Sequence, residues 1–292
     1  MEEENTLTKI EYIDLDKVLK TKSPGLSKML PGFVKAYIKR IIHQDELNYY
    51  LKNHGHLMGI EFIDSVLKEM GVKLETKGLA NIPDGGRAII ASNHPLGGLD
   101  GIALMLVAGR KRPDLAFPVN DILMNVKNLE PLFIPINKHG SNADNIKIIN
   151  ENFASDKLIC YFPFGLVSRK KKGEIMDLNW KTTFITKAKR FKRDIIPTNI
   201  SGRNSNWFYN LSNLRKKLGI KANIEMLYLV DEFAKQKGQT IKFTFGQAVS
   251  YKTFDKRYKN DEWAEFMRRF SYKLAEGYEG SFEEYISEIK KQ

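Results

Sequence analysis

The stretch that decides the fold is Ala-Ile-Ile-Ala-Ser-Asn-His-Pro-Leu-Gly-Gly-Leu-Asp-Gly, residues 88–101. It begins as an apolar, β-branched run, which predicts a buried strand that ends at Ser92. A turn with a proline and two glycines follows, and a helix is predicted to begin near Gly101. In an open α/β sheet, ligands bind beyond the carboxyl ends of the strands, and His94 lies at that position.

His94 and Asp100 are the candidate catalytic pair of this turn. The two glycines let the chain turn back, so that the carboxylate of Asp100 can reach the imidazole. A carboxylate on one ring nitrogen fixes the tautomer and leaves the other nitrogen free to accept a proton from a hydroxyl. Taken singly, Asp100 is also well placed to cap the following helix, and His94 could be a polar turn residue. Taken together with Asn93 and the glycines, the pattern favours a function.

A second apolar strand runs into a Pro/Gly turn at Tyr-Phe-Pro-Phe-Gly-Leu-Val-Ser-Arg-Lys-Lys-Lys-Gly, residues 161–173. Backbone amides and an arginine beyond a strand end can bind a phosphate, so Arg169 is predicted to bind substrate. The alternative is a solvated basic loop, and for the lysines 170–172 this alternative is favoured.

Two further strands end in polar or basic loops. Residues 194–205 run into Arg203 and Asn204, which could bind an acceptor headgroup or equally cap the next helix. Residues 132–140 carry Lys138 after a fourth strand. Because the carboxyl ends of parallel strands meet at one edge of a sheet, these loops predict one shared site above it.

Alternating strand-like and helix-like stretches over residues 73–250 predict an α/β domain with a largely parallel, buried central sheet flanked by helices. Residues 1–72 and 251–292 are predicted to be helical extensions. The expected strands lie at 73–77, 88–92, 132–137, 158–163, 194–200, 222–230 and 241–249. The expected helices within the domain lie at 100–110, 142–154, 178–191 and 205–218.

The composition is that of a globular protein with a basic balance. Of 292 residues, 42% are hydrophobic, and 47 Lys and Arg against 35 Asp and Glu give a net charge of +12. Such a surface attracts nucleic acid, acidic lipid or an acidic carrier protein. With no secretory signal and no apolar run of transmembrane length, a cytoplasmic protein on the inner face of the membrane is expected. The single cysteine, Cys160, fits a reducing compartment and is expected in the core.

The segment from Leu26 to Ile42 has apolar residues at helical spacing, with lysines and Arg40 between them. A basic amphipathic helix can place its apolar face among lipid headgroups and pair its cations with lipid phosphates. The alternative, which the pattern alone favours, is a helix that packs this face on the protein's own core. Contact of residues 1–72 with an anionic membrane surface therefore stays open.

These motifs resemble those of the glycerolipid acyltransferases, and their order and rough spacing match over residues 75–205. The chain most resembles the bacterial hemolysin-like group that acylates ornithine or glycine lipids, since Trp180 and the Gly-Arg-Asn-Ser run at 202–205 are also similar to it. The first to fourth sequence blocks of the family correspond to residues 93–100, 133–138, 162–169 and 195–200.

Two departures from the family pattern bear on the chemistry. Five residues separate His94 from Asp100, where the usual pattern has four, and the longer Gly-Gly loop can absorb the difference. In the family, a glutamate of the third block helps to shape the acceptor phosphate site, and Phe164 replaces it here. This favours another acceptor, such as a lyso-aminolipid. The second block lacks a clear arginine, and Lys138 is the substitute.

The resemblance implies O-acyl transfer from a thioester of coenzyme A or acyl carrier protein to the hydroxyl of a lysolipid, without a metal or further cofactor. His94 would act as general base, Asp100 would hold the imidazole, and backbone amides around Gly165 would stabilise the oxyanion. The predicted acceptor is an ornithine- or glycine-type lyso-aminolipid, with 1-acylglycerol-3-phosphate as the alternative. The substrate is predicted to contact Asn93, Lys138, Gly165, Ser168, Arg169, Arg203 and Asn204.

The competing class is a non-catalytic basic protein that binds lipid or nucleic acid. The clusters 189–193 and 215–217 could contact nucleic-acid phosphates. The sequence contains no recognised nucleic-acid-binding module, so no nucleic-acid partner is expected. Cysteines and histidines at metal-ligand spacing are also missing, and no metal site is predicted.

Overall fold

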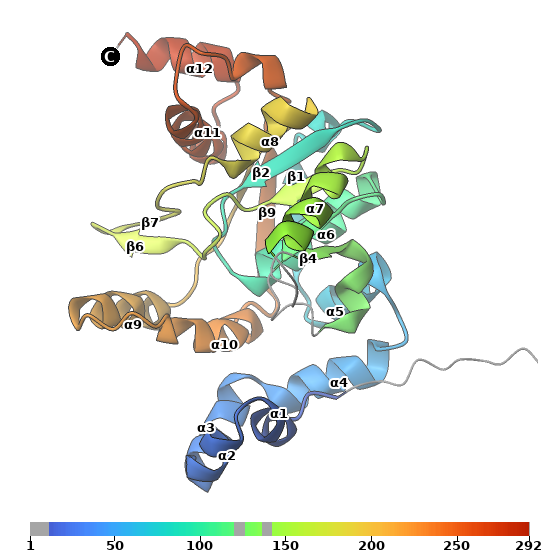
Figure 1. Ribbon diagram of the computed structural model, residues 1–292, viewed down its shortest axis with the longest axis vertical. Helices are drawn as coiled ribbons and strands as arrows, with labels where there is room; N and C mark the ends of the chain where they lie inside the picture. The colour runs from blue at the N-terminus through green and yellow to red at the C-terminus, as the bar shows by residue number, and fades with distance from the viewer. Residues whose placement is uncertain (1–11, 120–125, 136–141, 292) are drawn as a thin grey trace, which may run out of the picture.

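A computed structural model describes residues 12–119, 126–135 and 142–291. Its central sheet has the strand order β1-β9-β8-β2-β5. Within it, β1 with β9, β8 with β2, and β2 with β5 are parallel, whereas β9 runs antiparallel to β8. The predicted α/β class, with a largely parallel sheet flanked by helices, is confirmed (Figure 1). These strands are β1 Lys73–Lys77, β2 Ala88–Ser92, β5 Ile159–Tyr161, β8 Asp194–Ile200 and β9 Thr240–Phe245.

The continuous apolar run of β2 is explained by helices on both faces of the sheet. Ala88 and Ile90 belong to one buried cluster, which includes side chains of α5 and α6. Ile89 and Ala91 point to the opposite face and belong to a second cluster, with α8, α11 and α12. The helices are α1 Leu15–Lys22, α2 Pro24–Met29, α3 Gly32–Ile41, α4 Gln44–His54, α5 Gly59–Glu69, α6 Gly98–Lys111, α7 Asn142–Ala154, α8 Thr183–Phe191, α9 Asn206–Lys217, α10 Leu229–Ala234, α11 Asn260–Ala275 and α12 Phe282–Ile289.

The smaller strands differ from the sequence prediction. The short strands β3 (Phe117–Val119) and β4 (Phe133–Pro135) pair in parallel, and β6 (Arg169–Lys171) and β7 (Glu174–Met176) form a hairpin. Of these four, only β4 was predicted, as part of the longer apolar run at 132–137. The other three were missed, since runs of three residues are too short to show a period.

The strand predicted at residues 222–230 is wrong. The chain there forms the 3-10 helix η4 (Ile224–Tyr228), which continues into α10. Glu225 and Glu232 are both fully buried, and they lie seven residues apart. Residues at this spacing share one face of a helix, whereas a strand would place them on opposite faces.

The N-terminal helices lie at one end of the molecule, and α11 and α12 lie at the other (Figure 1). The Tyr37 hydroxyl is hydrogen-bonded to that of Tyr228 at 2.7 Å, which ties α3 to η4. The helix α5 instead packs into the main core, although the prediction assigned it to the N-terminal region; the three-part division 1–72, 73–250 and 251–292 stays a prediction. No helix in the described ranges is long and apolar enough to span a bilayer.

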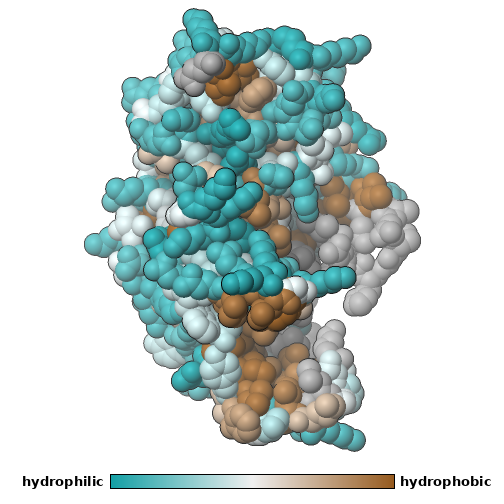
Figure 2. All heavy atoms as spheres, turned by 90° about the vertical axis from the view of Figure 1, so that its left-hand side faces the viewer, coloured by the Kyte–Doolittle hydropathy of each residue, from teal (hydrophilic) through white to brown (hydrophobic). Residues whose placement is uncertain are grey.

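The N-terminal helices expose large apolar side chains. Met29 is 79% exposed and Phe33 is 76% exposed. Trp207 of α9 and Leu218, which directly follows α9, are also exposed. Figure 2 shows hydrophobic side chains gathered on the lower part of one face, the end at which Figure 1 places the N-terminal helices. The apolar positions of the segment 26–42 are therefore only partly used in packing.

Arg193 joins the helical layer to the sheet. Its side chain is fully buried and donates only to main-chain carbonyls, among them those of Phe153 and Lys157 at 2.7 Å and that of Ala88 at 3.2 Å. These bonds connect the end of α7 to the start of β2. Burial lowers the pKa of Arg193 to about 10, so the guanidinium stays charged at neutral pH.

We predict that Arg193→Met lowers the free energy of unfolding by about 3 kcal/mol or more, because several buried carbonyls lose their donor. Arg190→Met is the matched control, since Arg190 is an exposed residue of α8, the helix that ends two residues before Arg193. Thermal and denaturant unfolding would measure both variants. Equal stability of Arg193→Met and the control would contradict the assignment.

Candidate active site

The structure brings His94 and Asp100 together. Atom Nδ1 of His94 lies 2.8 Å from Oδ1 of Asp100, and the amide of Leu96 donates to Oδ2 of Asp100 at 2.7 Å. The helix α6 begins at Gly98, earlier than predicted, so Asp100 lies in its first turn. Gly97 has φ 83°, a conformation that favours glycine. The Gly-Gly turn thus accommodates the five-residue spacing, and Asp100 both orders the turn and contacts the imidazole.

The geometry defines how the imidazole can react. Asp100 is fully buried, and the side chain of His94 is 17% exposed. Because a carboxylate only accepts, Nδ1 of His94 carries the proton when the ring is neutral, and Nε2 is the acceptor. The ring of Phe162 stacks on the imidazole, with centroids 4.0 Å apart and planes at 20°. One carboxylate and one aromatic ring therefore orient a partly exposed base.

The main chain of His94 is held by Asp177, which the sequence analysis did not identify. Oδ1 of Asp177 accepts from the His94 amide at 3.3 Å and from the Ser168 hydroxyl at 2.6 Å. Its Oδ2 accepts from the indole N–H of Trp180 at 2.9 Å. The Ser168 amide donates to the His94 carbonyl at 2.8 Å. Both main-chain polar groups of His94 are thus bonded to residues 168–177.

Asp177 is fully buried. Burial raises the pKa of its carboxyl, and the hydrogen bonds from Ser168 and Trp180 act in the opposite direction. One signal could have found this residue: a buried indole N–H needs an acceptor, and Trp180 follows Asp177 by three positions. Ser168, predicted to bind substrate, has its hydroxyl engaged here.

Two other residues that were predicted to contact substrate use their polar groups in hydrogen bonds within the protein. The side chain of Asn93 donates to the carbonyl of Ile200 at 2.9 Å and accepts from the amide of Ile200 at 2.7 Å. It thereby joins the loop after β2 to the end of β8. Gly165 has φ 70°, and its amide donates to the carbonyl of Phe162 at 3.0 Å. This amide is used inside the turn, so the oxyanion role predicted for it does not fit this geometry.

Arg169 is turned into the protein. Its Nη2 lies 3.1 Å from Glu225, and its guanidinium lies over the ring of Phe208. Arg215 pairs with the same fully buried Glu225 at 2.5 Å. Burial lowers the pKa of Arg169, and Glu225 opposes this effect. The predicted phosphate-binding role of Arg169 is therefore not supported, because its guanidinium is buried and directed toward Glu225 inside the protein.

The same inward orientation weakens the nucleic-acid interpretation. Arg215 belongs to the cluster 215–217 and Arg193 belongs to the cluster 189–193, yet both arginines are buried. Neither cluster forms an uninterrupted row of exposed cations.

The remaining predicted contacts lie after β8 or outside the described residues. Arg203 is exposed and Asn204 is buried, and both line a cavity of about 510 Å³ at the carboxyl edge of the sheet. Leu96, from the turn that carries His94, is part of the cavity wall. Lys138 lies outside the described residues. Within the ranges that the structure describes, no group of three or more His, Cys, Asp or Glu side chains could hold a metal ion.

The motifs and the His94–Asp100 pair point to acyl transfer, and comparison with known proteins decides the family. A family model described as "Acyltransferase" matches residues 17–280. The chain belongs to this acyltransferase family. The relationship predicted from the sequence blocks is confirmed, and the protein is an acyltransferase enzyme.

Two relatives of this acyltransferase are named lyso-glycine lipid O-acyltransferase. The protein from Phocaeicola vulgatus is 47% identical over 91% of this chain and 96% of its own length. The protein from Bacteroides thetaiotaomicron is 46% identical over 90% of this chain and 97% of its own length. A solved structure, the 1-acyl-sn-glycerophosphate acyltransferase PlsC from Thermotoga maritima, aligns at 15% identity and TM-score 0.47 over 84% of this chain and 92% of that one.

We predict that Asp177→Asn lowers kcat for acyl transfer by about 10- to 100-fold and changes the acceptor KM little. An amide cannot accept on both of its atoms, so the His94 loop loses part of its support, and small misplacements of a reacting group cost this much. Asp156→Asn is the control, because Asp156 is exposed and pairs only with Arg87. Wild-type kcat in a folded Asp177→Asn variant would show that Asp177 does not position His94.

Proposed function

We propose that this acyltransferase moves a fatty acyl group from an acyl thioester to the hydroxyl of a lysolipid, and that the acceptor is a lyso-glycine lipid. The 2.8 Å contact between His94 and Asp100 is the observation that carries the chemistry. The two relatives named lyso-glycine lipid O-acyltransferase, similar over nine-tenths of the chain, support the acceptor.

The reaction follows from the free nitrogen of the imidazole. Nε2 of His94 accepts the proton of the acceptor hydroxyl as that oxygen attacks the thioester carbonyl. Asp100 stabilises the imidazolium that forms. When the tetrahedral intermediate collapses, the carbon–sulfur bond breaks and the imidazolium returns the proton to the leaving thiolate. Atoms and charge balance without a metal or a further cofactor.

The third block supports an acceptor without a phosphate group. Phe164, at the position of the family's glutamate, is buried in the apolar cluster with Trp180 and Phe184. Arg169 of the same block is paired with Glu225. Neither residue offers a charged group to a phosphate, so 1-acylglycerol-3-phosphate is the less favoured acceptor. The donor is coenzyme A or acyl carrier protein, and the net charge of +12 suits the acidic carrier.

The test is acyl transfer by the purified protein from palmitoyl-coenzyme A or palmitoyl-acyl carrier protein. The acceptors are a lyso-glycine lipid, a lyso-ornithine lipid and lysophosphatidate. We predict that the lyso-glycine lipid has the highest kcat/KM. His94→Ala and Asp100→Asn should each lower kcat by about 10²–10⁴-fold, the usual contribution of a positioned base.

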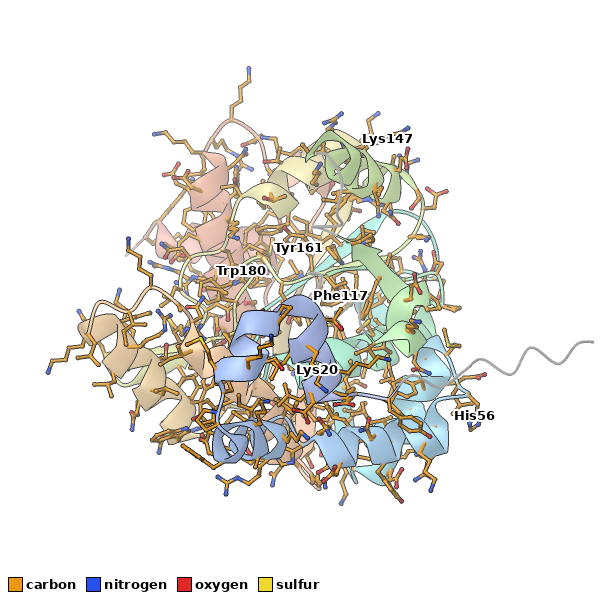
Figure 3. The ribbon with its side chains drawn as sticks, turned by 60° about the horizontal axis from the view of Figure 1, so that its bottom comes forward. Lys20, His56, Phe117, Lys147, Tyr161 and Trp180 are labelled. Atoms are coloured by element: carbon orange, nitrogen blue, oxygen red, sulfur yellow. The ribbon has the colours of Figure 1, made fainter. Side chains whose placement is uncertain are left out.

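His56→Ala is the matched control. His56 is exposed and lies at the edge of the molecule (Figure 3). Circular dichroism would check that each variant is folded. Activity that survives His94→Ala would exclude the general-base mechanism. Preference for lysophosphatidate would overturn the acceptor assignment and leave the mechanism intact.

We also propose that the enzyme works on an anionic membrane surface, at the inner face, where the thioester donors are found. The exposed apolar side chains of α2 and α3 support this, because Met29 and Phe33 are each more than three-quarters exposed. Lys28 and Arg40 are exposed in the same two helices, and Lys35 is half-buried. Apolar side chains and cations together are the features that bind an amphipathic helix to acidic lipid.

We predict that the double variant Met29→Ser/Phe33→Ser binds vesicles of phosphatidylglycerol and phosphatidylcholine about 10-fold more weakly than the wild type, because less apolar area enters the lipid. Ile146→Ser is the control, since Ile146 is an exposed apolar residue of α7. Sedimentation with vesicles would measure the binding. Unchanged binding of the double variant would remove α2 and α3 from the contact.

A further inference from the structure

The cavity at the carboxyl edge of the sheet adjoins the His94 turn. The loop after β8 forms one wall, the start of β9 forms another, and α10 contributes a third. Leu96 lies two residues beyond His94, and its side chain would be 3.0 Å from a Cβ placed on Gly202 of the facing loop. Two residues of chain span at most about 7 Å, so this wall of the cavity is close to the base.

Arg203 is the cation of this cavity that is available to a ligand. Its Nη2 donates to the neutral side chain of Asn206 at 2.6 Å, and among the described residues it makes no ion pair. Lys235, the other cation of the lining, is held by Asp231 at 2.7 Å and by Glu232 at 2.8 Å. Arg203 is therefore the cation of the lining that has no carboxylate partner among the described residues, which suits a single anionic group.

The carboxylate of Glu232 is already satisfied. Its Oε1 and Oε2 accept from the hydroxyl and the amide of Ser205 at 2.6 and 2.5 Å. Since Ser205 caps α9, these bonds also keep the N-terminus of α9 covered. Glu232 thus shapes the cavity without competing for Arg203.

Asn204 is a second sign of a binding site in the same lining. It is 1% exposed, and neither its side-chain oxygen nor its side-chain nitrogen has a hydrogen-bond partner within the described part of the chain. A buried amide without partners costs about 1–3 kcal/mol, so such a group is retained where a ligand supplies the partner.

We infer that this cavity binds the headgroup of the acceptor, and that Arg203 pairs with a carboxylate on it. The inference rests on the proposed function, because a glycine joined to a fatty chain through its nitrogen keeps a free carboxylate. That amide linkage also offers the donor and acceptor that Asn204 lacks. With the headgroup in the cavity, the acceptor hydroxyl reaches His94 past Leu96. Arg203 is then the residue that selects carboxylate lipids.

The test separates headgroup binding from turnover. N-dodecanoylglycine has the headgroup carboxylate but no hydroxyl to acylate, and N-dodecanoylglycinamide is its neutral counterpart. Calorimetric titration would measure both probes against the wild type, Arg203→Gln and Arg190→Gln. We predict that the wild type and Arg190→Gln bind the carboxylate probe about 10-fold or more tightly than the amide, as a charge-assisted pair allows, and that Arg203→Gln does not discriminate.

Asn204→Leu tests the second contact. We expect a melting temperature no lower than that of the wild type and weaker binding of both probes. Binding of both probes at wild-type affinity would remove Asn204 from the site.

Equal affinity of the two probes for the wild type, or discrimination that survives in Arg203→Gln, would overturn the assignment of the cavity. These results are independent of the proposed function. Discrimination between the probes without acyl transfer to a lyso-glycine lipid would refute that function and keep the headgroup site. Acyl transfer to a lyso-glycine lipid without discrimination between the probes would support the proposed function and refute the headgroup site. In kinetics, Arg203→Gln is expected to raise the acceptor KM about 10-fold and to leave kcat within about 2-fold.

Discussion

The contact between the buried carboxylate of Asp100 and His94 is the interaction on which the rest of the site depends. A carboxylate can be fully buried only when its oxygens are hydrogen-bonded, and here the imidazole and the Leu96 amide are its partners. Both partners lie in one tight turn. That turn needs a residue at positive φ, which Gly97 supplies. The geometry of the His94–Asp100 pair and the backbone conformation of the turn therefore depend on each other.

Buried carboxylates organise the rest of the carboxyl edge in the same way. Asp177 holds the main chain of His94, Glu225 gathers Arg169 and Arg215, and Glu232 covers the start of α9. Each links a loop at the strand ends to a segment far away in sequence. A buried charge that loses its partners is costly, so such links favour one arrangement of the loops. The loop that carries His94 is consequently held by hydrogen bonds to distant segments as well as by its own turn.

The sequence predicted those features whose causes are local. The strand ends, the Gly-Gly turn and the pairing of His94 with Asp100 depend on residues within one short stretch. Asp177 could not be found in this way, because its partners include a main-chain amide 83 positions away. The inward orientation of Arg169 was missed for a similar reason. Its guanidinium bonds to Glu225, which lies 56 positions away in a segment that was predicted to be a strand. Periodicity carries no information about such distant pairs.

The substitution of Phe164 and the inward turn of Arg169 have a common consequence. Phe164 is buried in an apolar cluster, and the guanidinium of Arg169 is buried beside Glu225, so neither side chain of the third block presents a charge to the surface. The enzyme still needs to hold the acceptor, and Arg203, after the neighbouring strand β8, is an exposed cation that makes no ion pair with the residues that the structure describes. Asn93 bonds the loop after β2 to Ile200 at the end of β8, so the loops that carry His94 and Arg203 start from two strand ends that are held together. Under the proposed function, a different headgroup would be bound by a different loop at the same edge of the sheet, with the His94–Asp100 pair unchanged.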